Sequence, residues 1–91
     1  MERQSAAELA LVRRLLKDAD GRVSRCAVRV ARQQALVEEL RRADRSVTSA
    51  RSVLEEYEKS LQQSLAHREM LRSELKTLRE RLEVPARRAG S

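Results

Sequence analysis

Apolar side chains in the first half of the chain recur at alternating spacings of three and four residues. The stripe comprises Leu9, Val12, Leu16, Ala19, Val23, Cys26, Val30 and Gln33, and it is apolar except at its last position. This spacing keeps one side of a helix turned toward a single partner. It predicts a long amphipathic helix that packs against another helix along this stripe.

A second stripe with the same spacing follows, offset by three residues from the first. It comprises Leu36, Leu40, Ala43, Val47, Ala50, Leu54, Tyr57, Leu61, Ser64, Arg68, Leu71, Leu75, Leu78 and Leu82. A slip of three residues indicates either a stammer in one continuous rod or a change of partner near a hairpin turn. Periodicity alone leaves both interpretations open.

Local chemistry between the stripes favours a turn at residues 44–46. Arg41 and Arg42 suit the last turn of a helix, and Ser46 suits the N-cap of the next one, although no Gly or Pro seals the turn. Folding there gives two arms of about 38 residues, each roughly 57 Å long. We therefore predict an all-α fold, an antiparallel two-helix coiled-coil hairpin.

The predicted hairpin occupies residues 5–83 as one domain. Ser5 and Glu8 form a capping-box pattern, so the first helix is expected over about 5–43, after an N-terminal extension of residues 1–4. The second helix is expected over about 47–83. Pro85 then stops it, and residues 84–91 are expected to form a flexible basic tail.

The segment 18–21, Asp-Ala-Asp-Gly, is the least favourable for a helix in the first half. Because the stripe passes through Gly21 without losing phase, we interpret the segment as a kink or a frayed point within one helix. A true turn at this point is the alternative.

The composition agrees with long helices: 37% of the residues are charged, 41% are hydrophobic, and Tyr57 is the one aromatic residue. A single cysteine cannot form an intramolecular disulfide, and Cys26 with His67, the one histidine, does not make a zinc site. We expect no metal and no cofactor. Helix packing and self-association remain as sources of stability.

The apolar surface near the N-terminus is too broad for one partner helix, because it spans an arc of roughly 160°. It comprises Leu9, Leu11, Val12, Leu15 and Leu16. We expect these residues to form an oligomer interface, with dimerisation into a four-helix bundle or binding to a helix of another protein.

Four arginines, Arg22, Arg25, Arg29 and Arg32, follow spacings of three, four and three on one helical side, in a chain of net charge +6. The row lies roughly 110° from the centre of the apolar stripe. It is a candidate anion-binding stripe that could follow the phosphates of a nucleic acid. The chain has no aromatic stacking residues for this purpose, and a solvated basic face is the alternative.

No arrangement of residues indicates catalysis. His67 could act as a base for Ser64 one turn earlier, but no acidic residue stands at helical spacing to orient the ring. Cys26 lies on the apolar stripe, where cysteine usually acts as a small hydrophobe; Arg25 and Arg29 could favour its thiolate, and an interchain disulfide is the alternative. We expect neither an enzyme nor a small-molecule substrate.

Two polar residues, Ser64 and Arg68, interrupt the second stripe. They fix the register of the helices, or the Arg68 stem passes along the seam to reach water. The polar start of the sequence and the lack of an apolar run of about 18 residues predict a cytoplasmic protein without membrane insertion.

One group of proteins shares part of this pattern. Residues 30–40, Val-Ala-Arg-Gln-Gln-Ala-Leu-Val-Glu-Glu-Leu, followed by Ala50, Leu54 and residues 67–71, His-Arg-Glu-Met-Leu, resemble small uncharacterised proteobacterial helical-hairpin proteins. The resemblance spans roughly residues 28–78 and implies a hairpin with its turn near residue 44. The group carries no known activity. The sequence therefore predicts a structural or protein-interaction module, with electrostatic nucleic-acid binding as the alternative.

Overall fold

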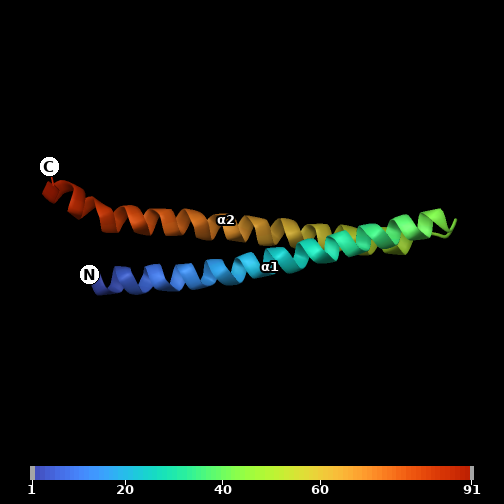
Figure 1. Cartoon of the computed structure of the whole chain (residues 1–91), viewed down its shortest axis with the longest axis horizontal. Coiled ribbons are helices and arrows are strands. Elements are labelled where there is room, and N and C mark those ends of the chain that lie inside the picture. The colour runs from blue at the N-terminus through green and yellow to red at the C-terminus, as the bar shows by residue number, and fades with distance from the viewer. Residues whose placement is uncertain (1, 91) are drawn as a thin grey trace.

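The computed structural model describes the backbone of residues 2–90 and the side chains of residues 4–82. Within this range the chain forms helix α1 (Glu2–Arg42) and helix α2 (Thr48–Gly90), with no strand. The helices run antiparallel and pack along their lengths in a rod of 70 × 22 × 14 Å (Figure 1). The predicted all-α helical hairpin is confirmed.

One continuous seam between the helices forms the core, and it follows both predicted stripes. The buried residues are Val12, Ala19, Val23, Cys26 and Val30 on α1, and Ala50, Ser64, Leu71, Leu75 and Leu78 on α2. At other positions of the second stripe the half-buried residues are Leu40, Val47, Leu54, Tyr57, Leu61, Arg68 and Leu82, whereas Ala43 is exposed in the turn. The spacing of three and four residues that characterises coiled coils is thus the spacing of the buried positions.

Leu36 was predicted to open the second stripe, and this is wrong. Its side chain is 41% exposed, whereas Val37 and Leu40 are half-buried. The seam of α1 runs from Gln33 to Val37 and Leu40 without a slip, because α1 is one uninterrupted helix until Arg42 and keeps its periodicity. The change of register takes place across the turn.

The turn occupies residues 43–47, which include the predicted residues 44–46. The Asp44 N–H donates to the carbonyl of Arg41 (3.1 Å), and the Arg45 N–H donates to the carbonyl of Leu40 (2.9 Å). With Asp44 at φ 57°, in the left-handed region, these bonds form a Schellman motif that closes α1 without glycine.

The cap of α2 differs from the prediction by one residue. The Val47 carbonyl accepts the first helical bond, from the Arg51 N–H at 2.8 Å, so Val47 and not Ser46 occupies the N-cap position. The Ser46 hydroxyl instead lies 3.5 Å from the hydroxyl of Thr48, as a donor. The reason is that the Schellman motif uses residues 44 and 45, which moves the start of α2 one residue along the chain.

Both helices are longer than predicted. α1 begins at Glu2 rather than Ser5, since residues 2–4 are good helix formers that extend the first turn. α2 continues past Pro85 to Gly90, where strong helix formers at 86–89 carry the helix on despite one lost hydrogen bond. The side chains of residues 83–91 lie outside the described residues, and the predicted flexibility of residues 84–91 stays a prediction.

Gly21 lies within α1, and no glycine of the described chain adopts a positive φ. The alternative of a true turn at residues 18–21 is therefore wrong. Tertiary packing of the stripe on both sides of Gly21 holds the segment in the helix.

Candidate interaction face

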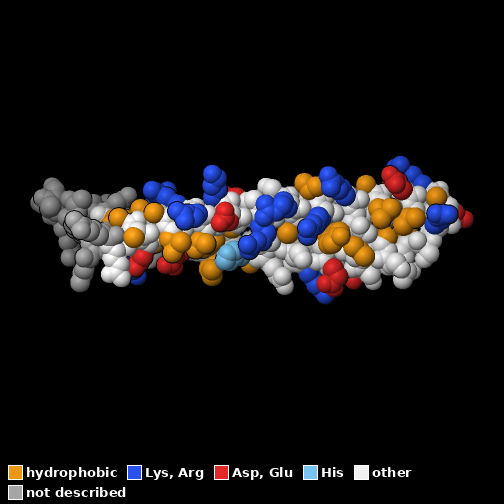
Figure 2. Space-filling view, turned by 90° about the horizontal axis from the view of Figure 1, so that it is seen from below, with side chains coloured by type: hydrophobic (Ala, Val, Ile, Leu, Met, Phe, Trp, Pro, Cys, Tyr) orange, Lys and Arg blue, Asp and Glu red, His pale blue; other side chains and the backbone are white. Residues whose placement is uncertain are grey.

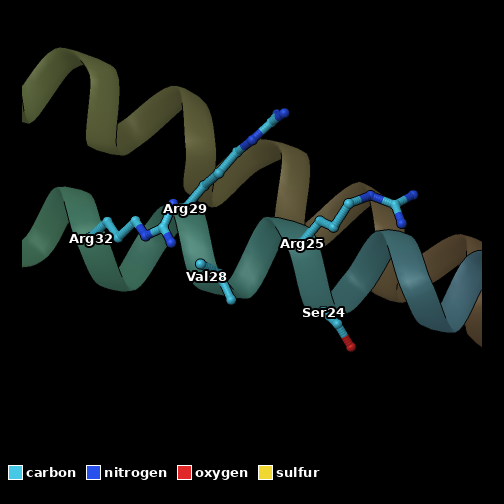
Figure 3. Close-up of a pocket in the computed structure, with 5 residues that line it drawn as sticks. All are labelled: Ser24, Arg25, Val28, Arg29 and Arg32. Carbon is cyan, nitrogen blue, oxygen red and sulfur yellow. The ribbon is translucent and has the colours of Figure 1, made fainter.

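The four arginines of the candidate anion-binding stripe are all exposed on α1. Within residues 4–82, no ion pair involves any of them. Three of them, with Ser24 and Val28, line a shallow hollow of about 310 Å³ on the side of the rod (Figure 3). The structure thus presents the predicted stripe as a row of charged groups without carboxylate partners.

Register explains why these arginines are unpaired. Cys26 lies beside Ser64 (Sγ to Oγ 3.6 Å) and Asp20 beside Arg68 (Oδ1 to Nη1 3.7 Å), so Arg22 and Arg29 lie level with His67 and Ser60 on α2. Neither of these residues is acidic. Residues 22–36 of α1 itself contain no acidic residue either.

Other arginines behave differently. At the end of α1, the Arg41 guanidinium donates to Glu38, and Arg42 lies 3.9 Å from the same carboxylate. The hydrogen bond from Arg41, with its positive charge, lowers the pKa of Glu38 below its ordinary value. Among the described residues Arg13 and Arg14 of α1 also lack an ion pair, so the central stripe is distinguished by its four arginines in a row on one side of the helix.

Large apolar side chains also remain exposed, and most of them share a side with the arginines. They are Leu11 (53%), Leu15 (41%), Val28 (47%), Leu36 (41%), Val53 (39%) and Met70 (58%). Leu11 and Leu15 precede the arginine row at helical spacing, and Leu36 follows it four residues after Arg32.

Val53 and Met70 belong to the same side because of the antiparallel arrangement. Positions directly before a seam residue of each helix flank the same side of such a pair. Leu36 directly precedes Val37 on α1, and Val53 directly precedes Leu54 on α2. Met70 lies on the same edge of α2 as Val53, one turn after His67. Figure 2 shows one side of the rod, on which basic and apolar side chains alternate along much of its length.

We call this surface the arginine face. It consists of Leu11, Leu15, Arg22, Arg25, Arg29, Arg32 and Leu36 on α1, and Val53, Ser60, His67 and Met70 on α2. Val28 lies beside it, on the outer side of α1. Sequence reasoning did not place Leu36, Val53 and Met70 on this face. Each of them stands directly before a seam residue, and this position was the signal that could have identified them.

The predicted oligomer interface is divided by the fold. Val12 is buried in a cluster with Leu75 and Leu78, and Leu9 and Leu16 pack against that cluster. These three residues belong to the hairpin's own seam, where α2 buries Val12 and partly covers Leu9 and Leu16, and their role in an oligomer interface stays a prediction. Leu11 and Leu15 remain exposed beyond the reach of α2.

The remaining candidate residues do not converge. Ser64 is buried beside the Cys26 thiol, whereas His67 is exposed, and residues 4–82 show no hydrogen bond between Ser64 and His67. Cys26 is a free, buried cysteine of the seam. No three potential metal ligands come together among the described residues.

No protein-family model, curated protein or solved structure matches the chain. The resemblance to the proteobacterial group stays a prediction. Neither described helix is long and apolar enough to cross a membrane.

Proposed function

We propose that this chain is a non-enzymatic structural or protein-interaction module that works by helix packing, either with a second copy or with a helix of another protein. The observation that supports it is the arginine face, where five large apolar side chains are between 39% and 58% exposed although the seam is already filled. Large exposed apolar side chains that lie together on one side of a molecule are typical of sites that contact other proteins.

The distribution of these side chains favours a specific contact over nonspecific hydrophobic association. The five lie along one side of a narrow rod, and the opposite edge of the seam presents Arg13, Asp20, Arg51 and Arg72. A helix laid along the arginine face could contact both α1 and α2, as a third helix does in a bundle. We further propose a cytoplasmic location, which agrees with the free Cys26.

Self-association is tested by light scattering coupled to size exclusion on the full chain. If copies pair through the exposed leucines, the wild type gives a dimer mass at tens of micromolar (about 10⁻⁵ M), and L11S/L15S gives a monomer. The matched control V28S removes an exposed apolar side chain outside the face and keeps the dimer. A wild-type chain that stays monomeric and helical would contradict self-association.

A second candidate function is electrostatic binding of nucleic acid. The observation that favours it is the set of four unpaired arginines over about 15 Å of helix. Fluorescence anisotropy with single-stranded and duplex oligonucleotides would then give an affinity that falls steeply with salt and is lost in R22Q/R25Q/R29Q/R32Q. Absence of binding at low salt contradicts this candidate.

A further inference from the structure

The arginine face has an order along the rod: apolar, basic, apolar. Leu11 and Leu15 lie toward the open end, the four arginines lie in the middle, and Leu36 with Val53 lies toward the turn. Leu11 and Leu36 are separated by about 38 Å of helix. A helix of roughly 28 residues would cover the whole sequence of patches.

The middle of the face is basic on α1 and carries no acidic residue at the flanking positions of α2. Arg22 and Arg29 flank the seam on α1, and His67 and Ser60 flank it on α2, with Arg25 on the outer side. On this side Asp18 stands one turn before Arg22 and Glu56 lies about level with Arg32, and among the described residues neither carboxylate forms an ion pair with the four arginines. A partner that lies here must bring its own negative charge to avoid burying unpaired arginines.

A second copy of the chain does not meet this requirement. Because the order of patches reads the same from either end, a two-fold pairing over the whole face sets one arginine row against the other, and a staggered pairing that joins only the Leu11 and Leu15 patches leaves both arginine rows uncovered. Like charges placed together in this way oppose association. A phosphate backbone would match the charge at the centre but would leave the apolar patches at both ends uncovered. Tyr57, the one aromatic residue that could stack on a base, is half-buried in the seam.

We infer that the arginine face binds an acidic amphipathic helix of another protein, with apolar residues near both its ends and carboxylates in its central turns. The inference rests on the proposed function and specifies its partner. Charge complementarity at the centre sets the register of the bound helix, and the leucine, valine and methionine side chains supply apolar contact at its ends.

The test uses three synthetic helical peptides of about 28 residues with identical apolar positions and with Glu, Gln or Lys in the central turns. Their affinities for the full chain are measured by fluorescence anisotropy. We expect the Glu peptide to bind at least about tenfold more tightly than the Gln peptide, and the Lys peptide not to bind. Raising the salt concentration should weaken the Glu peptide most.

Variants of the chain locate the site. R25S/R29S should weaken the Glu peptide by at least about tenfold, while R13S/R51S, which removes the same charge from the opposite edge, should change it less than about twofold. Circular dichroism confirms that each variant stays helical.

Equal binding of all three peptides would overturn the inference of an acidic partner but would still support the proposed binding of a partner helix. Failure of every peptide to bind would overturn it together with the partner-helix branch of the proposed function. Displacement of the Glu peptide by an oligonucleotide of higher affinity would overturn it in favour of nucleic-acid binding.

Discussion

At the scale of single residues, Arg68 is the most unusual member of the seam. Its side chain is 24% exposed, and Nη1 lies 3.7 Å from Oδ1 of Asp20 at the edge of the helices. Its Nε is buried without a hydrogen-bond partner among the described residues. The stem therefore follows the seam and the head reaches the edge, which agrees with the snorkelling interpretation of this position.

Replacing Arg68 with leucine should stabilise the hairpin. R68L removes a buried unsatisfied donor and restores the apolar stripe, so we expect the free energy of unfolding to rise by about 1 to 2 kcal/mol. Urea denaturation followed by circular dichroism measures this. R72L is the control, since Arg72 is half-exposed and pairs with Glu69 on the surface; an R68L variant no more stable than R72L contradicts the argument.

At the scale of elements, α1 contains a glycine that is unfavourable for a helix, and packing against α2 keeps this segment helical. Gly21 is helical, and a Cβ built there would approach Nη1 of Arg25 at 3.2 Å, the flexible end of a long side chain. Sequence propensity alone left a turn open at this point. The helix persists because Ala19 and Val23 are both buried against α2.

Gly21 offers the simplest stabilising substitution in α1. G21A should raise the free energy of unfolding by about 1 kcal/mol, because alanine loses less backbone entropy in a helix and the Arg25 tip can move aside. A thermal melt by circular dichroism should show a higher midpoint. Q34A, at an exposed position of the same helix, serves as the control with a much smaller gain.

The turn holds its strain at Asp44. Its φ of 57° suits glycine, and its carboxylate sits beside the negative end of α1. D44G should stabilise the hairpin by about 1 kcal/mol, whereas D44A, which keeps a Cβ, should not. Chemical denaturation of the two variants in parallel distinguishes them, and equal stabilities would contradict the role of backbone conformation.

At the scale of the whole molecule, large apolar packing is concentrated at the open end. Val12, Leu75 and Leu78 form the buried cluster there, whereas Cys26 and Ser64 meet in the middle of the seam. Near the turn, the Gln33 side chain donates to the Ala50 carbonyl at 2.9 Å. The rod therefore depends on its open end for hydrophobic stabilisation.

Truncations at the open end should show this dependence. L78A, at a side chain only 2% exposed, should cost about 2 to 4 kcal/mol, while L11A, at one 53% exposed, should cost less than about 0.5 kcal/mol. Denaturant titration gives both values. Similar losses in the two variants would mean that Leu11 is also buried, as it would be in a stable dimer.

The sequence by itself determined both helices, the position of the turn and nearly every seam residue, because spacings of three and four residues specify one buried side of a helix. It also located the arginine row. It could not place Leu36, which is apolar and fits either stripe, nor extend the helices past Ser5 and Pro85.

Only the tertiary structure decided which edges of the helices share a side. The antiparallel register brings Val53 and His67 level with Leu36 and Arg22, and it leaves the four arginines without an ion pair among the described residues. It also divided the N-terminal leucines between the seam and the surface. These outcomes depend on contacts between residues that are distant along the chain, and periodicity within one helix carries no information about its neighbour's edge.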